Sequence, residues 1–125
     1  MAKWSMLLTG NYRCIGKDNV QSIHDAVHGD IAASADVYAY VDKLVQRLGA
    51  ESADAVPFEK YARAATSLLK PSSAARAIDA GATNIERVDR LVQAVAANLG
   101  LHHAEVDRIV ALVDHRLSTQ AVAAA

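Results

Sequence analysis

The sequence contains few of the residues that support several common kinds of protein. A single cysteine, Cys14, occurs among 125 residues, which excludes a disulfide framework within the chain. We interpret it as a small buried apolar residue, because no neighbouring group would activate its thiol. The six glycines are isolated from one another, and none has the G-x-G-x-x-G spacing that brings backbone against a pyrophosphate. We therefore expect no nucleotide site in this chain.

Charge of one sign and long apolar runs are also lacking. The formal net charge is -1 at pH 7, and the 13 basic residues are scattered among 14 acidic ones. Without a basic stripe, neither nucleic acid nor an acidic membrane surface is an expected partner. No apolar run approaches the roughly 20 residues that a membrane-spanning helix needs. The first ten residues lack the small-residue cleavage site of a secretory signal, so we expect a cytoplasmic protein.

A helical pattern, by contrast, extends along almost the whole length of the sequence. Apolar residues recur at steps of three and four, which places them on one face of a helix. The clearest stripe consists of Ile85, Val88, Leu91, Val92, Val95 and Leu99. Similar stripes cover residues 31–48 and 106–117, and no segment alternates apolar and polar residues as a half-buried strand does. The expected fold is all-α, a multi-helix bundle forming a single domain over residues 1–125.

Helix boundaries can be predicted from capping residues and glycines. Shorter helices are expected at residues 4–13, 19–27, 57–69 and 71–80. The helix that starts near Ile85 has Thr83 and Glu86 in a capping-box arrangement and ends at Gly100. Residues 49–57 should form a loop. The C-terminal residues 118–125 should fray, because their small side chains bury little area.

Two segments carry more specific landmarks. Residues 70–92 contain a Pro-Ser-Ser helix start, an apolar helix, Gly81 and a second helix led by Glu86. Near the N-terminus, Trp4 is followed by two leucines and then Asn11. This combination resembles the C-terminal, substrate-binding domain of ketopantoate reductases (2-dehydropantoate 2-reductases). The resemblance spans nearly the whole chain and implies the helical fold of that domain in the 6-phosphogluconate-dehydrogenase-like enzymes.

The resemblance also implies that parts of the enzyme are missing from this chain. Complete family members hold NADPH on a nucleotide-binding domain ahead of the tryptophan, and only three residues precede Trp4, so we expect that domain to be absent. The family's general acid is a lysine two positions after the tryptophan, and a substrate-contacting asparagine follows four residues later. Met6 and Gly10 occupy these positions, and we interpret the nearby Lys3 as an ordinary exposed lysine. We expect no catalytic residue, no NADPH binding and no ketopantoate reduction by this chain alone.

Three residues remain as candidates for binding a 2-oxo acid or another small anion. Asn11 is either a retained polar contact or a turn residue. Ser73 lies where the resemblance implies contacts with the carboxylate and hydroxyl of the substrate, at a helix start that favours anions, but helix capping alone also explains it. Glu86 corresponds to an acidic residue of the family that contacts the substrate, but the capping box alone also explains it, and we prefer that explanation. Asp89, one turn further on, could take its place.

The histidines do not indicate a metal site. His24 and His28 are one helical turn apart and could place two imidazoles on one face, but no third ligand is evident. His102 and His103 follow Gly100, and we interpret them as solvated turn residues.

Three classes of function are compatible with the sequence. The chain could be the substrate-binding and dimerisation half of a ketopantoate-reductase-like oxidoreductase, a helical oligomerisation scaffold, or a small anion-binding module. We prefer the first. Its expected partner is a second copy or a separate nucleotide-binding domain, because Trp4, Leu7 and Leu8 would otherwise form an apolar strip facing water.

Overall fold

Helices make up the computed structural model, which describes all residues 1–125. The first helical segment consists of α1 (Trp4–Met6), a π-helix (Leu7–Asn11) and a short 3-10 turn (Tyr12–Cys14). It is followed by α2 (Ile23–His28), α3 (Ile31–Arg47), a 3-10 turn (Ser52–Asp54), α4 (Phe58–Ala65), α5 (Ser73–Asp79), α6 (Val88–Asn98) and α7 (Ala104–Ala124). There is no strand, only an isolated antiparallel bridge between Ile15 and Val20. The all-α prediction is confirmed.

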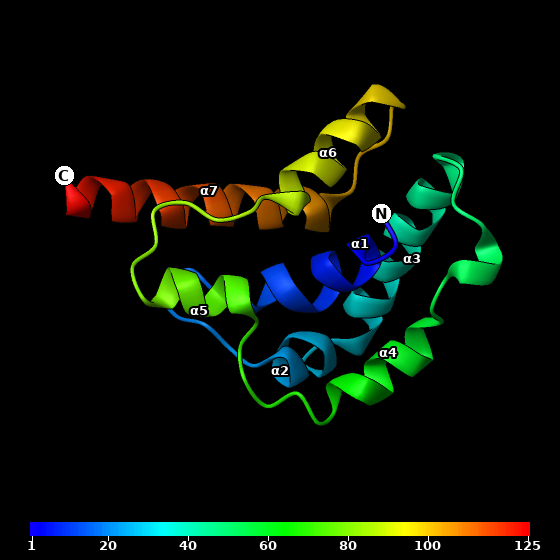
Figure 1. Ribbon diagram of the computed structural model, residues 1–125, viewed down its shortest axis with the longest axis horizontal. Coiled ribbons are helices and arrows are strands. Elements are labelled where there is room, and N and C mark those ends of the chain that lie inside the picture. The colour runs from blue at the N-terminus through cyan, green and yellow to red at the C-terminus, as the bar shows by residue number, and fades with distance from the viewer.

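The N-terminal segment runs through the middle of the molecule (Figure 1). In this view, α6 and α7 lie on one side of it and α2 and α4 lie on the other, while α3 lies beside its N-terminal part and α5 lies near its opposite end. The π-helix contacts α2, α3, α5 and α6, and the adjoining 3-10 turn contacts α7. None of the helices combines the length and the apolar composition needed to cross a lipid bilayer.

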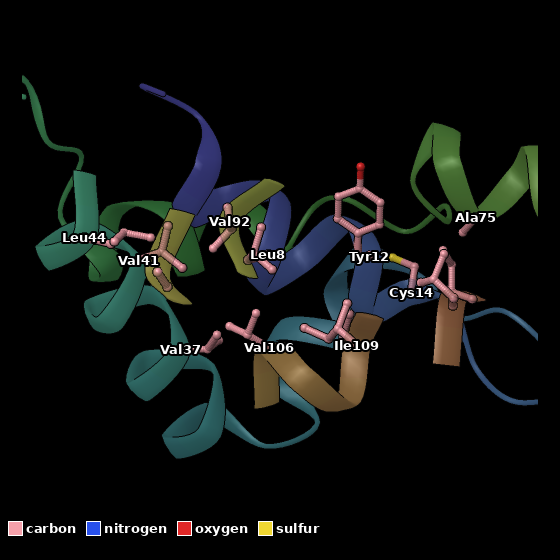
Figure 2. Close-up of a cluster of buried hydrophobic side chains, with 14 of the residues drawn as sticks. Leu8, Tyr12, Cys14, Val37, Val41, Leu44, Ala75, Val92, Val106 and Ile109 are labelled. Carbon is pink, nitrogen blue, oxygen red and sulfur yellow. The ribbon is translucent and has the colours of Figure 1, made fainter. Parts of the chain in front are cut away.

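The main apolar core surrounds this central segment. Figure 2 shows Leu8 among apolar side chains of α3, α6 and α7, including Val41, Val92 and Val106. Leu8 is fully buried, and Trp4 and Leu7 pack half-buried against the same cluster. The expectation that these three residues form a strip facing water is therefore wrong for Leu8, which the core covers, whereas Trp4 and Leu7 are only partly covered. An exposed apolar strip of these three residues therefore no longer supports self-association, which stays a prediction.

A second, smaller cluster lies between α2, α3 and α4. Its members are Val27, Tyr38, Tyr61, Ala62 and Ala65, and Met6 and Phe58 pack against them. The Tyr38 and Tyr61 rings stack with centroids 5.5 Å apart. This cluster fixes α4, which carries Tyr61, against the N-terminal segment.

Two helix ends differ from the prediction for identifiable reasons. Helix α6 begins at Val88 after Arg87 and has no side-chain cap, so the capping box of Thr83 and Glu86 does not form. The Tyr12 hydroxyl instead holds the backbone of this segment outside the helix. Helix α7 continues to Ala124, so the predicted fraying is also wrong. Alanine has the highest helix propensity, and it supports these last turns without burial.

Other boundaries differ for local reasons. Helix α2 begins at Ile23, not at residue 19, because the bridge between Ile15 and Val20 keeps that stretch extended and Ser22 caps the helix. Helix α4 ends at Ala65, four residues before the predicted end, in a series of turns. Helix α5 is capped by Ser72, whose hydroxyl accepts a hydrogen bond from the Ala75 amide.

The structure also places the cysteine and one histidine pair. Cys14 is fully buried as predicted, and burial raises the pKa of its thiol. His103 is not a solvated turn residue: its Nδ1 accepts a hydrogen bond from the Glu105 amide and caps α7, while its Nε2 lies 2.7 Å from an Asp36 carboxylate oxygen. His102 is exposed. No group of three or more potential metal ligands occurs in the chain.

The tyrosines predict a loss of stability at alkaline pH. Burial raises the pKa of all four, that of Tyr38 to about 12. A tyrosine whose pKa is raised in the folded state contributes stability that is complete below its ordinary pKa of 10.0 and is lost at higher pH. In chemical unfolding curves, we expect the tyrosine contribution to be constant up to about pH 10 and to decline between pH 10 and 12, and the buried Cys14 thiol adds a loss that begins near its ordinary pKa of 9.0. The decline should be shallower in Tyr38→Phe; an equally steep decline in this variant would contradict the assignment.

Candidate functional site

Asn11, Ser73 and Glu86 line one cavity of about 380 Å³. They come from three segments: the end of the π-helix, the first turn of α5, and the stretch that precedes α6. The other lining residues are Leu7, Tyr12, Ala74, Ala77, Asn84, Ile85 and Val88. We call this space the Glu86 cavity, because Glu86 is its one charged residue.

The π-helix positions Asn11 at the cavity. Its wide turn is closed by the Tyr12 amide, which donates to the Leu7 carbonyl five residues earlier. Such turns are rare, and they frequently mark functional segments of helices. The Asn11 carbonyl in turn accepts a hydrogen bond of 2.8 Å from the Ser72 hydroxyl. Because Ser72 also caps α5, this one hydroxyl holds the start of α5, and with it Ser73, beside Asn11.

Tyr12 fixes the opposite wall. Figure 2 shows its hydroxyl directed away from the apolar cluster. The hydroxyl donates to the Glu86 carbonyl at 2.6 Å and accepts from the Val88 amide at 2.9 Å. Burial, the largest of several effects, raises the pKa of Tyr12. The tyrosine therefore acts as a neutral clamp on the backbone that carries Glu86.

A network of ion pairs stabilises the same wall on the side that faces away from the cavity. Arg87 contacts both Asp89 carboxylate oxygens at 2.9 Å and Asp114 at 2.6 Å. The Asp89 side chain is fully buried, so it does not reach the cavity as an alternative to Glu86. The Glu86 side chain is exposed and forms no ion pair, and its carboxylate is free to meet a ligand.

Met6 and Gly10, at the family's lysine and asparagine positions, do not line the Glu86 cavity. Met6 packs against the second cluster instead. A Cβ atom at residue 10 would overlap the Tyr61 hydroxyl and lie 3.1 Å from Tyr61 Cζ. The Tyr61 hydroxyl donates to the Met6 carbonyl at 3.3 Å, and the same tyrosine fills the space beside Gly10.

The sequence alone does not identify Tyr12, Tyr61 or Asn84 as residues of this region. A signal exists for Tyr12, which follows Leu8 by four residues on a buried helix face, where a tyrosine hydroxyl needs a partner. Tyr61 and Asn84 give no comparable signal, because their neighbours come from distant parts of the chain.

Comparison with known proteins does not identify a family. No protein-family model, no curated protein and no solved structure matches the chain. The assignment of a function therefore depends on the residues and geometry described above.

Proposed function

We propose that this chain is a small-molecule-binding helical domain of the kind that forms the substrate-binding half of ketopantoate-reductase-like, NADPH-dependent oxidoreductases. The observation that carries the proposal is the meeting of Asn11, Ser73 and Glu86 in one cavity of about 380 Å³. Cavities of this size are typical of small-ligand sites. Six of the ten lining residues are hydrophobic, and the polar ones converge from separate segments.

The polar groups suit a small oxygen-rich molecule such as a 2-oxo acid. The Ser73 hydroxyl and the Asn11 amide can donate hydrogen bonds to ligand oxygens, whereas the Glu86 carboxylate accepts from a ligand hydroxyl or amine. The hydrogen bonds from Tyr12 and Ser72 hold in place the backbone that carries Glu86 and Asn11 before a ligand arrives. Binding then requires little ordering of the protein, which favours affinity.

The same geometry supports binding without catalysis. Reduction of a carbonyl needs a proton donor within hydrogen-bond reach of the developing alkoxide. Met6 cannot supply a proton, and the Tyr12 hydroxyl already donates to a backbone carbonyl. Hydride would come from NADPH held by another domain or chain. The cavity therefore orients a substrate, and the reduction depends on groups supplied from elsewhere.

Ligand titration tests this proposal. Ketopantoate should bind the isolated chain with a Kd on the order of 1 mM, about -4 kcal/mol. The affinity is low because the cavity is open and none of its lining residues is a cation that could pair with the ligand carboxylate. NADPH should not bind. Ser73→Trp should abolish ketopantoate binding and leave the fold intact, since Ser73 is exposed. The control is Ser118→Trp, at an exposed α7 position outside the cavity. Micromolar NADPH binding, or ketopantoate binding that survives in Ser73→Trp, would contradict the proposal.

A helical oligomerisation scaffold is the second candidate. It is favoured by exposed large apolar residues, among them Leu69, Leu91 and Val122, which are 72%, 47% and 75% exposed. Leu69 lies in the loop before α5, Leu91 lies on α6 and Val122 lies on α7. A scaffold should self-associate in sedimentation experiments without any ligand, whereas a binding domain has no such requirement.

A further inference from the structure

A second cavity adjoins the first. It has a volume of about 430 Å³ and shares two lining residues, Asn11 and Ser73, with the Glu86 cavity. Its other lining residues are Ile23, Ser67, Leu68, Leu69, Lys70, Pro71, Ser72 and Arg76. We call it the Arg76 cavity, because its charged residues, Lys70 and Arg76, are both basic. Because Asn11 and Ser73 line both cavities, we refer to the two cavities together as the groove.

The charges at the two ends of this groove are opposite and unpaired. The ion pairs of the chain are Arg13 with Glu105, His24 with Asp25, Arg87 with Asp89 and Asp114, His103 with Asp36, and Arg108 with Glu105. Lys70, Arg76 and Glu86 belong to none of them. All three are exposed and need not be stripped of a partner when a ligand binds. Between them lie the neutral polar side chains of Asn11 and Ser73.

This arrangement determines which ligand charge fits where. Within the Glu86 cavity, a carboxylate placed next to Glu86 would meet a like charge and no cation, so the carboxylate of a 2-oxo acid lies at the Ser73 and Asn11 end, away from Glu86. A carboxylate in the Arg76 cavity would meet two cations, one of them a guanidinium that can bind it in a bidentate manner. At the other end, the Glu86 carboxylate accepts hydrogen bonds only, and an ammonium group supplies both donors and opposite charge.

Resting on the proposed small-molecule site, we infer that the groove binds a zwitterion with separated charges, an ω-amino carboxylate. Its carboxylate lies at Lys70 and Arg76, its ammonium group lies at Glu86, and its apolar chain crosses between Asn11 and Ser73. This ligand uses both cavities, whereas a small 2-oxo acid occupies one. Exposed ion pairs each contribute a few-fold in affinity, so the two ends together should favour the zwitterion by about tenfold over an uncharged ligand of the same length.

The test compares three probes of one chain length by titration calorimetry at low ionic strength, where exposed ion pairs are least screened. The probes are 6-aminohexanoate, hexanoate and hexylamine. We expect 6-aminohexanoate to bind a few-fold more tightly than either singly charged probe, because each of these keeps one of the two ion pairs and lacks the other. Arg76→Gln should weaken 6-aminohexanoate and hexanoate several-fold and leave hexylamine unchanged. Glu86→Gln should weaken 6-aminohexanoate and hexylamine and leave hexanoate unchanged or bound more tightly.

A matched control separates this effect from general electrostatics. Arg63→Gln removes an exposed arginine of α4 that lines neither cavity, and it should change none of the affinities. Equal binding of 6-aminohexanoate and hexanoate, or equal effects of Arg63→Gln and Arg76→Gln, would overturn the inference. In that case, ketopantoate binding that is lost in Ser73→Trp would still support the proposed function. If neither the three probes nor ketopantoate bind the chain, both the inference and the proposed function are refuted.

Discussion

Replacing Arg87 by methionine should lower the free energy of unfolding by about 3–5 kcal/mol, the cost of leaving a buried charge without its partner. The Asp89 carboxylate is fully buried and accepts two hydrogen bonds from the Arg87 guanidinium. Methionine fills a similar volume but cannot donate to that carboxylate. Denaturant unfolding monitored by circular dichroism gives the change directly, provided that the slope of the transition stays constant.

Two further variants identify the cause. In Arg87→Met combined with Asp89→Leu, the buried charge is gone, and most of the lost stability should return. Arg90→Met changes a neighbouring arginine that is exposed and unpaired, and it should alter the stability by less than about 0.5 kcal/mol. An Arg87→Met protein as stable as Arg90→Met would show that Asp89 is not held by this ion pair.

Adding one methyl group at Gly10 is expected to cause the second largest loss in the free energy of unfolding. Gly10→Ala should cost about 1–3 kcal/mol, the usual range for overpacking a core. The added Cβ would overlap the Tyr61 hydroxyl and lie 3.2 Å from a Val27 methyl group. Tyr61 cannot swing aside easily, because its ring is buried and stacks on Tyr38. Thermal or denaturant unfolding measures the loss.

The matched background for this experiment is Tyr61→Phe, which removes the hydroxyl but keeps the ring. In that background Gly10→Ala should cost clearly less, whereas the Tyr38→Phe background should leave the cost unchanged. Equal costs in all three backgrounds would mean that the Tyr61 hydroxyl does not limit residue 10. The result also bears on function, because an asparagine could not be introduced at residue 10 without a change at Tyr61.

The predictable parts of the fold are those encoded by local sequence. Helix α3, predicted at residues 31–48, is observed at Ile31–Arg47. Its apolar stripe is continuous, and it stops at Gly49, which adopts a φ of 105° that other residues avoid. Helix α6 starts later than its apolar stripe predicts, because Tyr12, 76 residues before Val88, determines where it begins. No local pattern contains that information.

The candidate site shows the same division. Asn11, Ser73 and Glu86 are recognisable in short motifs, and the structure places all three on one cavity. The adjoining cations cannot be predicted in this way, because Lys70 and Arg76 belong to no recognisable motif. Only the structure shows that they line a cavity together with Asn11 and Ser73. The π-helix is equally hidden in the sequence, since its extra residue leaves no mark on the apolar spacing.

That extra residue makes this segment unusually tolerant of a change in chain length. Each residue of an α-helix turns the chain by about 100°, so a deletion in a regular helix rotates everything that follows it. The π-helix takes up its extra residue within one wide turn, which the Tyr12 amide closes on the Leu7 carbonyl. Loss of one codon within Leu7–Asn11 would convert this wide turn into a regular one and leave the flanking parts of the chain in nearly the same orientation. A single in-frame deletion here would therefore remove one side chain from the segment without turning Tyr12 away from Glu86.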